Sequence, residues 1–206
     1  MMGLRRGGAA AAVTVEPEPE VTDEALLVLF ANGDPTVAAE LTRRLGPRVL
    51  GVATRVLGNR AEAEDVTQET MIRLWKMAPD WRQGEARVST WLYRVTMNLC
   101  IDIKRRARGG TVDLDAVPEP PDPAASAAET LQNQARADAL QAALMTLPER
   151  QRQAVVLRHI EELTNPEIAG IMEIGVEAVE SLTARGKRSL ARALAGRRDE
   201  LGYQDG

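Results

Sequence analysis

The residues that most often carry out catalysis are scarce in this chain. It has one cysteine, Cys100, and one histidine, His159, among 206 residues. A lone cysteine excludes an intrachain disulfide and a cysteine-cluster zinc site, and a lone histidine argues against a histidine metal site or a catalytic triad. The neighbouring carboxylates Glu161 and Glu162 have no acid–base partner set, and no glycine-rich phosphate loop is present. We therefore predict no metal, no cofactor and no enzymatic activity.

Arginines recur at helical spacing between residues 176 and 195, where their chemistry suits phosphate binding. The outer stripe of this predicted helix holds Arg185, Arg188 and Arg192, with Lys187 to one side. An apolar stripe lies opposite, made of Val179, Leu182, Gly186, Leu190 and Ala193. A short predicted helix over 164–172 and a turn over 173–175 precede it, which is the helix-turn-helix pattern. The alternative is a helical hairpin whose arginines are only solvated.

A second basic flank is expected on a helix over 88–106. Arg94, Asn98 and Arg105 share a narrow stripe there, close to the loop that carries Trp81 and Arg82. Arginine and amide side chains near an aromatic ring suit contacts to phosphates and unpaired bases, although a solvated face and a tryptophan that caps the core remain alternatives. Cys100 falls outside the expected core stripe. That stripe comprises Val88, Trp91, Leu92, Val95, Leu99 and Ile103.

The predicted helix over 61–77 has the opposite charge on its outer face. Its acidic face holds Glu62, Asp65 and Glu69, with Gln68 and Ile72 at the border. Carboxylates repel phosphate, so an exposed isoleucine beside them favours a protein partner over nucleic acid. A solvated acidic face is the alternative.

Helices account for the whole predicted fold, because no useful period-2 alternation occurs and aromatic residues make up 3%. We expect helices over 22–31, 34–58, 61–77, 88–106, 130–146, 148–160, 164–172 and 176–195. The predicted class is therefore all-α.

Charge divides the chain into segments. The net charge of −4 conceals basic blocks at 25–106 and 131–198, because acidic residues concentrate in residues 1–24, 107–130 and 199–206. The predicted domains are 22–106 and 131–198, with tails over 1–21 and 199–206. Four prolines accompany the acids of 107–130, which favours a flexible linker. We predict two small helical domains, joined by that linker and flanked by a disordered N-terminal tail and an acidic C-terminal tail. No apolar run reaches 18 residues, and Ala9–Val13 is too short for a signal-peptide core, so a cytoplasmic location is expected.

Three motifs resemble bacterial sigma-70-type factors of the extracytoplasmic-function (ECF) group. AEDVTQETMIRLW at 63–75 and STWLYRVTMNLCID at 89–102 are similar to conserved region 2. LPERQR at 147–152, followed by Glu167-Ile168-Ala169, is similar to region 4. The resemblance implies a sigma factor that binds core RNA polymerase and initiates transcription of a stress- or signal-responsive set of genes.

The resemblance also implies residue roles. Region 2 of the family docks on the polymerase β′ clamp, and the matching residues here are Asp65, Gln68, Glu69 and Ile72. Opening of the −10 promoter element falls to Trp81, Arg82, Arg94, Asn98 and Arg105. Region 4 meets the β flap and the −35 element, for which we select Ser181, Arg185, Lys187 and Arg188. An anti-sigma factor that covers the polymerase-binding faces is the usual inhibitor.

Two residues depart from the family pattern. Glu180 stands where a basic residue is usual, and Leu182 stands where arginine is frequent. Two other functions fit parts of the sequence. A helix-turn-helix regulator that binds DNA without polymerase leaves the acidic face unexplained, and a helical protein that binds no DNA leaves the arginine stripe as solvated charge.

Overall fold

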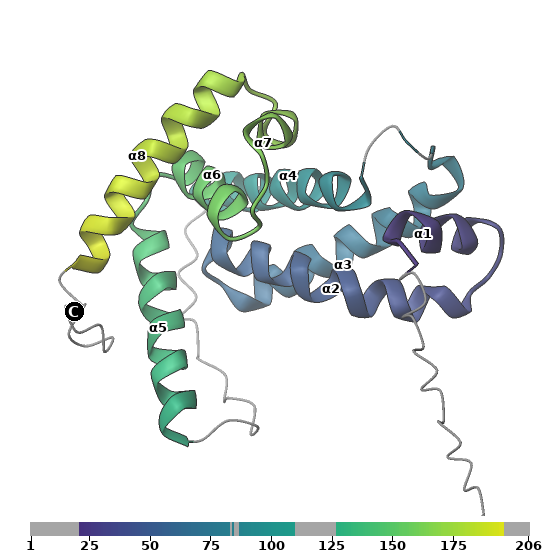
Figure 1. Ribbon diagram of the computed structural model, residues 1–206, viewed down its shortest axis with the longest axis horizontal. Helices are drawn as coiled ribbons and strands as arrows, with labels where there is room; N and C mark the ends of the chain where they lie inside the picture. The colour runs from purple at the N-terminus through teal and green to yellow at the C-terminus, as the bar shows by residue number, and fades with distance from the viewer. Residues whose placement is uncertain (1–20, 83, 85–86, 110–126, 196–206) are drawn as a thin grey trace, which may run out of the picture.

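The computed structural model describes residues 21–82, 84, 87–109 and 127–195, and these residues form helices and turns without any strand. Figure 1 shows the helices, with α4 running above α2 and α3 and with α8 at the C-terminal end. The elements are α1 (Asp23–Ala31), α2 (Thr36–Leu57), α3 (Arg60–Met77), η1 (Ala78–Asp80), α4 (Val88–Gly109), α5 (Ala127–Met145), α6 (Glu149–His159), α7 (Asn165–Met172) and α8 (Val176–Ala195). The predicted all-α class is confirmed.

Local capping signals fix several helix ends where the sequence predicts them. Thr22 Oγ1 accepts the Ala25 amide at the start of α1, and Asn59 Oδ1 accepts the Glu62 amide at the start of α3. Both contacts satisfy amides that have no partner within the helix. Gly58 ends α2 with φ 76°, a left-handed conformation that glycine adopts without steric cost. The starts of α1 and α3 and the end of α2 are therefore determined by residues close to them in the sequence.

One hydrophobic core lies between α1, α2, α3 and the first turns of α4. Its most deeply buried residues include Leu27, Leu41, Leu45, Leu74 and Leu92. They come from stripes spaced three or four residues apart, as expected for amphipathic helices. This core holds α3 and α4 in place, and with them both candidate surfaces of the N-terminal half.

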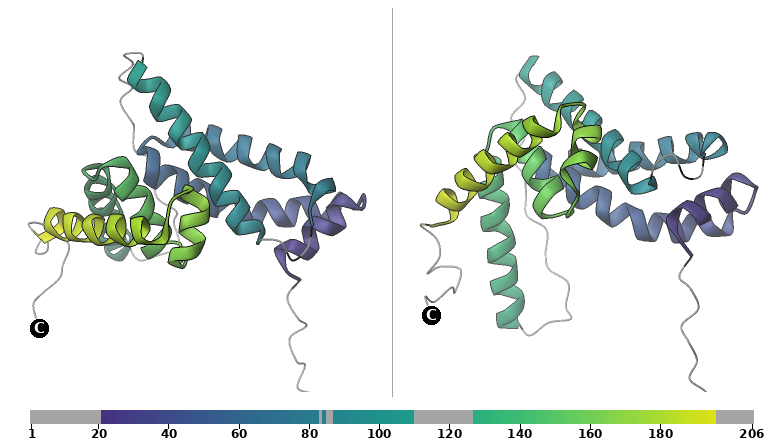
Figure 2. Two further views of the ribbon diagram at one scale, coloured as in Figure 1. Left: turned by 90° about the horizontal axis from the view of Figure 1, so that it is seen from above. Right: turned by 45° about the horizontal axis from the view of Figure 1, so that its top comes forward.

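A second core joins the two halves of the chain, which the sequence does not predict. Val56, Tyr93 and Met97 of the N-terminal half lie in one buried cluster with Leu157 and Ile171 of the C-terminal half. Helix α7 packs on α4, and both α5 and α6 pack on α2, as the turned views in Figure 2 also show. The two predicted helical modules are therefore present and packed against each other.

The predicted core stripe of α4 needs correction. Val88 and Leu92 are buried as expected, but Tyr93, Met97 and Cys100 are buried too, with Cys100 fully inaccessible. The remaining members of the predicted stripe are only half-buried, namely Trp91, Val95, Leu99 and Ile103. The reason is that α4 packs on two sides, against α2 and α3 and also against α7.

Several predicted boundaries reach beyond the described residues. Of the predicted linker 107–130, residues 107–109 end α4 and 127–130 begin α5, and the rest lies outside the described part of the chain. The predicted tails lie outside it as well, apart from residue 21.

Candidate nucleic-acid and partner interfaces

The acidic face of α3 is a mixed charged and apolar surface. Asp65, Gln68 and Ile72 are exposed, and Ile72 has 39% of its surface accessible. Glu69 is on the same face, where its Oε1 lies 2.7 Å from Nε of Arg73. The spacing of three and four residues brings these predicted polymerase-binding side chains onto one surface. The buried stripe on the other side of α3 comprises Ala63, Val66, Thr70, Met71 and Leu74.

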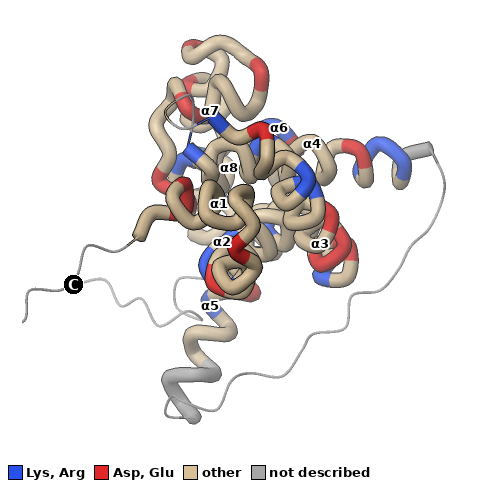
Figure 3. Tube along the Cα trace, turned by 90° about the vertical axis from the view of Figure 1, so that its right-hand side faces the viewer, with Lys and Arg blue, Asp and Glu red and all other residues tan. Residues whose placement is uncertain are grey.

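The predicted −10 residues of α4 lie on its exposed flank. Arg94, Asn98 and Arg105 are all exposed, and Arg105 Nη2 lies 3.0 Å from Asp102 Oδ1. Figure 3 shows basic residues toward the C-terminal end of α4 and acidic residues on α3. The two helices therefore present surfaces of opposite charge, as the sequence predicts.

The loop before α4 is anchored to the core through Trp81. This side chain is half-buried and packs against the cluster of α1, α3 and α4, and its Nε1 has no hydrogen-bond partner among the described residues. Arg82 follows it and is exposed. Part of the indole is therefore used in packing, and the rest is accessible to solvent.

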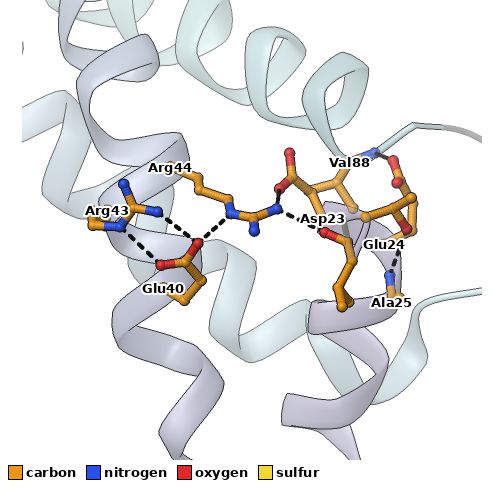
Figure 4. Close-up of polar contacts among 9 residues, drawn as sticks. Asp23, Glu24, Ala25, Glu40, Arg43, Arg44 and Val88 are labelled. Carbon is orange, nitrogen blue, oxygen red and sulfur yellow. Dashed lines mark hydrogen bonds and ion pairs between the residues drawn. The ribbon is translucent and has the colours of Figure 1, made fainter. Parts of the chain in front are cut away.

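Helix α1 fixes the start of α4 by a long-range cap (Figure 4). Glu24 Oε1 accepts the Val88 amide at 3.0 Å, although 64 residues separate them. Arg44 of α2 donates to Glu40 at 2.5 Å and lies 3.6 Å from Asp23, which ties α1 to α2. This network positions the entry of α4, and hence the stripe that contains Arg94.

The helix-turn-helix is formed by α7 and α8. A capping box starts α7, because Thr164 and Glu167 exchange side-chain to backbone hydrogen bonds. Gly186 of α8 is buried against α6, where an added Cβ would lie 2.5 Å from Val155 Cγ2. This close approach fixes how far α8 stands from α6.

The outer face of α8 carries the predicted −35 residues. Ser181, Arg185, Lys187 and Arg188 are all exposed. Arg185 donates from Nη2 to Ser181 Oγ at 2.8 Å and from Nε to the Ser181 carbonyl at 3.2 Å, which holds its guanidinium along the helix. Val176 at the first turn is 40% exposed, an apolar position that the sequence analysis did not select. Apolar contact with a thymine methyl is one role that such a position can fill.

The two family departures in α8 have structural explanations. Leu182 is half-buried and packs against the shared core, so it faces the protein. Glu180 is exposed, and its Oε1 accepts a 3.4 Å hydrogen bond from Asn165 Nδ2 of α7. Leu182 therefore contributes to the packing of α8, and Glu180 makes a surface contact with α7.

Polar contacts also cross between the two halves. Arg152 of α6 is 7% exposed, and its Nη1 donates to the Val56 carbonyl at 2.6 Å while its Nη2 donates to the Leu147 carbonyl at 3.1 Å. Tyr93 Oη donates to Glu161 Oε2 at 2.5 Å. Burial, with that carboxylate, raises the pKa of Tyr93, and burial lowers the pKa of Arg152. The sequence analysis gave none of these residues a role.

A cavity of about 180 Å³ lies where α4 meets α6 and α7. Asn98 lines it from α4, and Arg150, Gln153, Met172 and Glu173 line it from the C-terminal half. One edge of the predicted −10 surface therefore borders the C-terminal module.

No group of three or more metal-ligating side chains occurs among the described residues. None of the described helices is long and apolar enough to span a membrane. His159 is exposed at the end of α6, and partial burial with Lys187 and Arg158 lowers its pKa.

Fold and surfaces together define a class. The chain is an all-helical DNA-binding protein, with a helical module of opposed acidic and basic surfaces followed by a helix-turn-helix module. Residues 41–109 match the family described as sigma-70 region 2, and residues 137–190 match sigma-70, region 4. The chain belongs to the ECF group of the sigma-70 family of RNA polymerase sigma factors.

Curated relatives carry the same description. The ECF RNA polymerase sigma factor SigE of Mycolicibacterium smegmatis is 38% identical over 188 residues, which span 88% of this chain and 71% of that protein. SigM of Mycobacterium tuberculosis is 31% identical over 176 residues, spanning 85% and 86%. SigW of Bacillus subtilis is 29% identical over 172 residues, spanning 79% and 91%.

Solved structures share the fold. The sigma factor RpoE in complex with the anti-sigma factor NepR, from Bartonella quintana, aligns with a TM-score of 0.61 and 20% identity, covering 76% of this chain and 96% of that one. CnrH in complex with the cytosolic domain of CnrY aligns with a TM-score of 0.61 and 24% identity, covering 84% and 97%. At this identity the likeness concerns the fold.

Proposed function

We propose that this sigma factor divides its work among three surfaces: the α3 face binds core RNA polymerase, the α4 flank with its preceding loop opens the −10 element, and α8 reads the −35 element. The observation that carries the proposal is the placement of these chemically different, exposed surfaces on three separate helices. The role is binding and positioning, and it requires no bound metal or cofactor.

The α3 face supports a protein contact. Asp65 and Glu69 disfavour DNA at that surface, and exposed Ile72 provides an apolar anchor between polar neighbours. In this proposal the polymerase β′ clamp offers basic and apolar side chains that complement such a face. The charge of α3 also keeps DNA on the α4 side of the module.

The α4 flank supports strand opening. Unstacking a base costs a few kcal/mol, so the protein must offer contacts that form only with the opened strand. Arg94 and Arg105 supply phosphate contacts, and Asn98 supplies an amide for a base edge. Trp81 and Arg82 extend this surface from the loop.

On α8, recognition of the −35 element falls to Ser181, Arg185, Lys187 and Arg188. Arg185 and Arg188 stand one turn apart on the exposed side, and the Ser181 contact limits the freedom of Arg185. The side of the helix-turn-helix module opposite these residues is proposed to contact the polymerase β flap.

Control of this chain by an anti-sigma factor is part of the proposal. Of the two aligned structures, the sigma factor RpoE from Bartonella quintana is bound to such an inhibitor, the anti-sigma factor NepR. In this proposal the cytoplasmic sigma factor responds to stress or another signal through that partner.

The proposal is tested by separating polymerase binding from promoter opening. A chain with Arg94→Ala and Asn98→Ala is expected to bind core polymerase like the parent and to lose at least tenfold in the rate of −10 opening, followed by fluorescence of a base analogue in the non-template strand. Arg158→Ala, an exposed arginine of α6, is the control. Equal loss of binding and opening would contradict the assigned roles.

A gel-shift assay discriminates the rival function. A helix-turn-helix regulator that acts without polymerase would shift a specific DNA fragment in a gel at moderate salt by itself. The proposed sigma factor is expected to shift that fragment only together with core polymerase.

A further inference from the structure

The first turns of α8 carry acidic side chains, whereas its later turns carry basic ones. Glu177 and Glu180 are exposed near the start of the helix. The exposed basic residues of α8 follow them, namely Arg185, Lys187, Arg188 and Arg192. In a helix-turn-helix, the N-terminal residues of the second helix reach the base edges in the major groove. The part of α8 that is expected to meet the bases is therefore acidic.

Glu177 lies at the centre of the exposed face of α8. Val179 and Gly186 are buried and mark the side of the helix that faces the protein. At 100° per residue, Glu177 lies about 170° around the helix from the midpoint between them. Arg188 lies on nearly the same line, three turns further along. Glu177 and Arg188 therefore point directly away from the core of their module.

The exposed line that joins these two residues has the dimensions of a DNA groove. It also contains Ser181 and Ala184, both exposed. At 1.5 Å per residue, Glu177 and Ala184 lie about 10 Å apart along the helix axis, which fits a major groove about 12 Å wide. Arg188 lies about 16 Å from Glu177, at the distance of the phosphates that border the groove. Glu177 and Ser181 are thus the members of this line with polar groups inside the groove, and a serine hydroxyl pairs with several bases.

A carboxylate discriminates between bases more strictly than a hydroxyl does. When ionised it accepts hydrogen bonds and donates none. In the major groove, cytosine presents only the N4 amino donor, guanine and thymine present acceptors, and adenine presents one donor and one acceptor. A carboxylate is therefore satisfied opposite cytosine, whereas opposite guanine or thymine it faces acceptors and nearby phosphates that repel it.

The other acidic residue of these turns is held differently. Glu180 lies about 60° around the helix from Glu177, and its Oε1 accepts a 3.4 Å hydrogen bond from Asn165 Nδ2 of α7. Glu177 has no hydrogen-bond or ion-pair partner among the described residues. Its carboxylate can therefore pair with a base without breaking a contact within the protein.

We infer that Glu177 is a specificity-determining residue of α8, which accepts a hydrogen bond from the N4 amino group of one cytosine in the −35 element. The inference rests on the proposed function, in which α8 reads that element. Other bases at the same position leave the carboxylate unpaired in the groove. Specificity then arises from a penalty on the wrong sequences as well as from the contact with the right one.

The test measures the base preferences of the holoenzyme. Core polymerase with the full-length chain is incubated with copies of a promoter that the parent transcribes, in which the −35 region is randomised, and the bound DNA is sequenced. The parent is expected to prefer cytosine at one position about fivefold or more over guanine and thymine. Glu177→Gln is expected to move the preference at that position to adenine, because a glutamine amide pairs with N6 and N7 of adenine. Preferences at the other positions are expected to stay as in the parent.

Glu180→Gln is the matched control, because it removes the same charge from the same helix. It is expected to keep the cytosine preference and to change binding to all sequences alike. Unchanged base preferences in the Glu177→Gln holoenzyme would overturn the inference, even if its affinity for every sequence rose. A carboxylate in a first turn also stabilises its helix, but loss of that effect lowers the Tm and does not change which base is preferred. Failure of the proposed function would look different, as a parent holoenzyme that selects no sequence anywhere in the randomised region.

Discussion

Gly186 offers a sharp test of how α8 is positioned. An alanine there would place its Cβ 2.5 Å from Val155 Cγ2 and 3.2 Å from the Gln151 carbonyl oxygen, both in α6. Gly170 of α7 is also helical, but an added Cβ meets nothing within 4 Å there. Each substitution gains about 1 kcal/mol of helix propensity. Overpacking at Gly186 costs about 1–3 kcal/mol, and this cost has no counterpart at Gly170.

Both variants gain about the same helix propensity, so the difference between their free energies of unfolding measures the effect of the contact with α6. Gly186→Ala is expected to be less stable than Gly170→Ala by about 1–3 kcal/mol, or about 2–12 °C in Tm for a chain of this size. Thermal unfolding followed by circular dichroism at 222 nm measures both. Gly170→Ala is expected to exceed the parent. Equal Tm values for the two variants would refute the close approach of α8 to α6, and with it the described exposure of Arg185 and Lys187.

Three further predictions concern the surfaces and the core. Replacing Arg185 and Arg188 by alanine is expected to change how promoter binding by the holoenzyme depends on salt: the magnitude of the slope of log K against log salt falls by about 2. An unchanged slope in a salt titration would argue against phosphate contacts by these residues. Ile72→Ala is expected to weaken core polymerase binding about tenfold, with the free energy of unfolding unchanged within about 0.5 kcal/mol. Leu29 of α1 is an apolar residue of similar exposure, and Leu29→Ala is expected to leave binding intact in a fluorescence titration. Burial raises the pKa of Cys100 from 9.0 to about 12, so the folded chain favours the neutral thiol. This preference stabilises the folded chain fully below pH 9, and the stabilisation is lost as the pH rises from 9 toward 12. The thiol is expected to react with a disulfide reagent at pH 8 only after unfolding, and rapid reaction of the native chain would contradict its burial.

Local sequence patterns predict the helices and most of their faces well. The stripe of Val179, Leu182 and Gly186 does face the protein, and the acidic face of α3 is on the surface, because each follows from spacing within one helix. Capping residues such as Asn59 and Thr164 are equally local.

Contacts between distant segments are what the sequence does not reveal. Tyr93, Met97 and Cys100 form a second apolar stripe on α4 that makes sense only once α7 packs there. Nothing in the local sequence distinguishes Arg152 from the exposed arginines of a charged helix. Its burial depends on a hydrogen bond to the Val56 carbonyl, 96 residues away. The spacing of 93, 97 and 100 is a signal that could have indicated a second packing face, but not the identity of its partner. The assignment of Asp65, Asn98, Arg185 and the residues grouped with them to particular contacts stays a prediction.

Reconstituted transcription tests the central claim most directly. Core RNA polymerase is incubated with this chain and a library of genomic DNA fragments, and the 5′ ends of the transcripts are sequenced. The account predicts transcripts that require the chain and start at a fixed distance downstream of a shared pair of sequence elements. Transcript starts that are the same with and without the chain would contradict it.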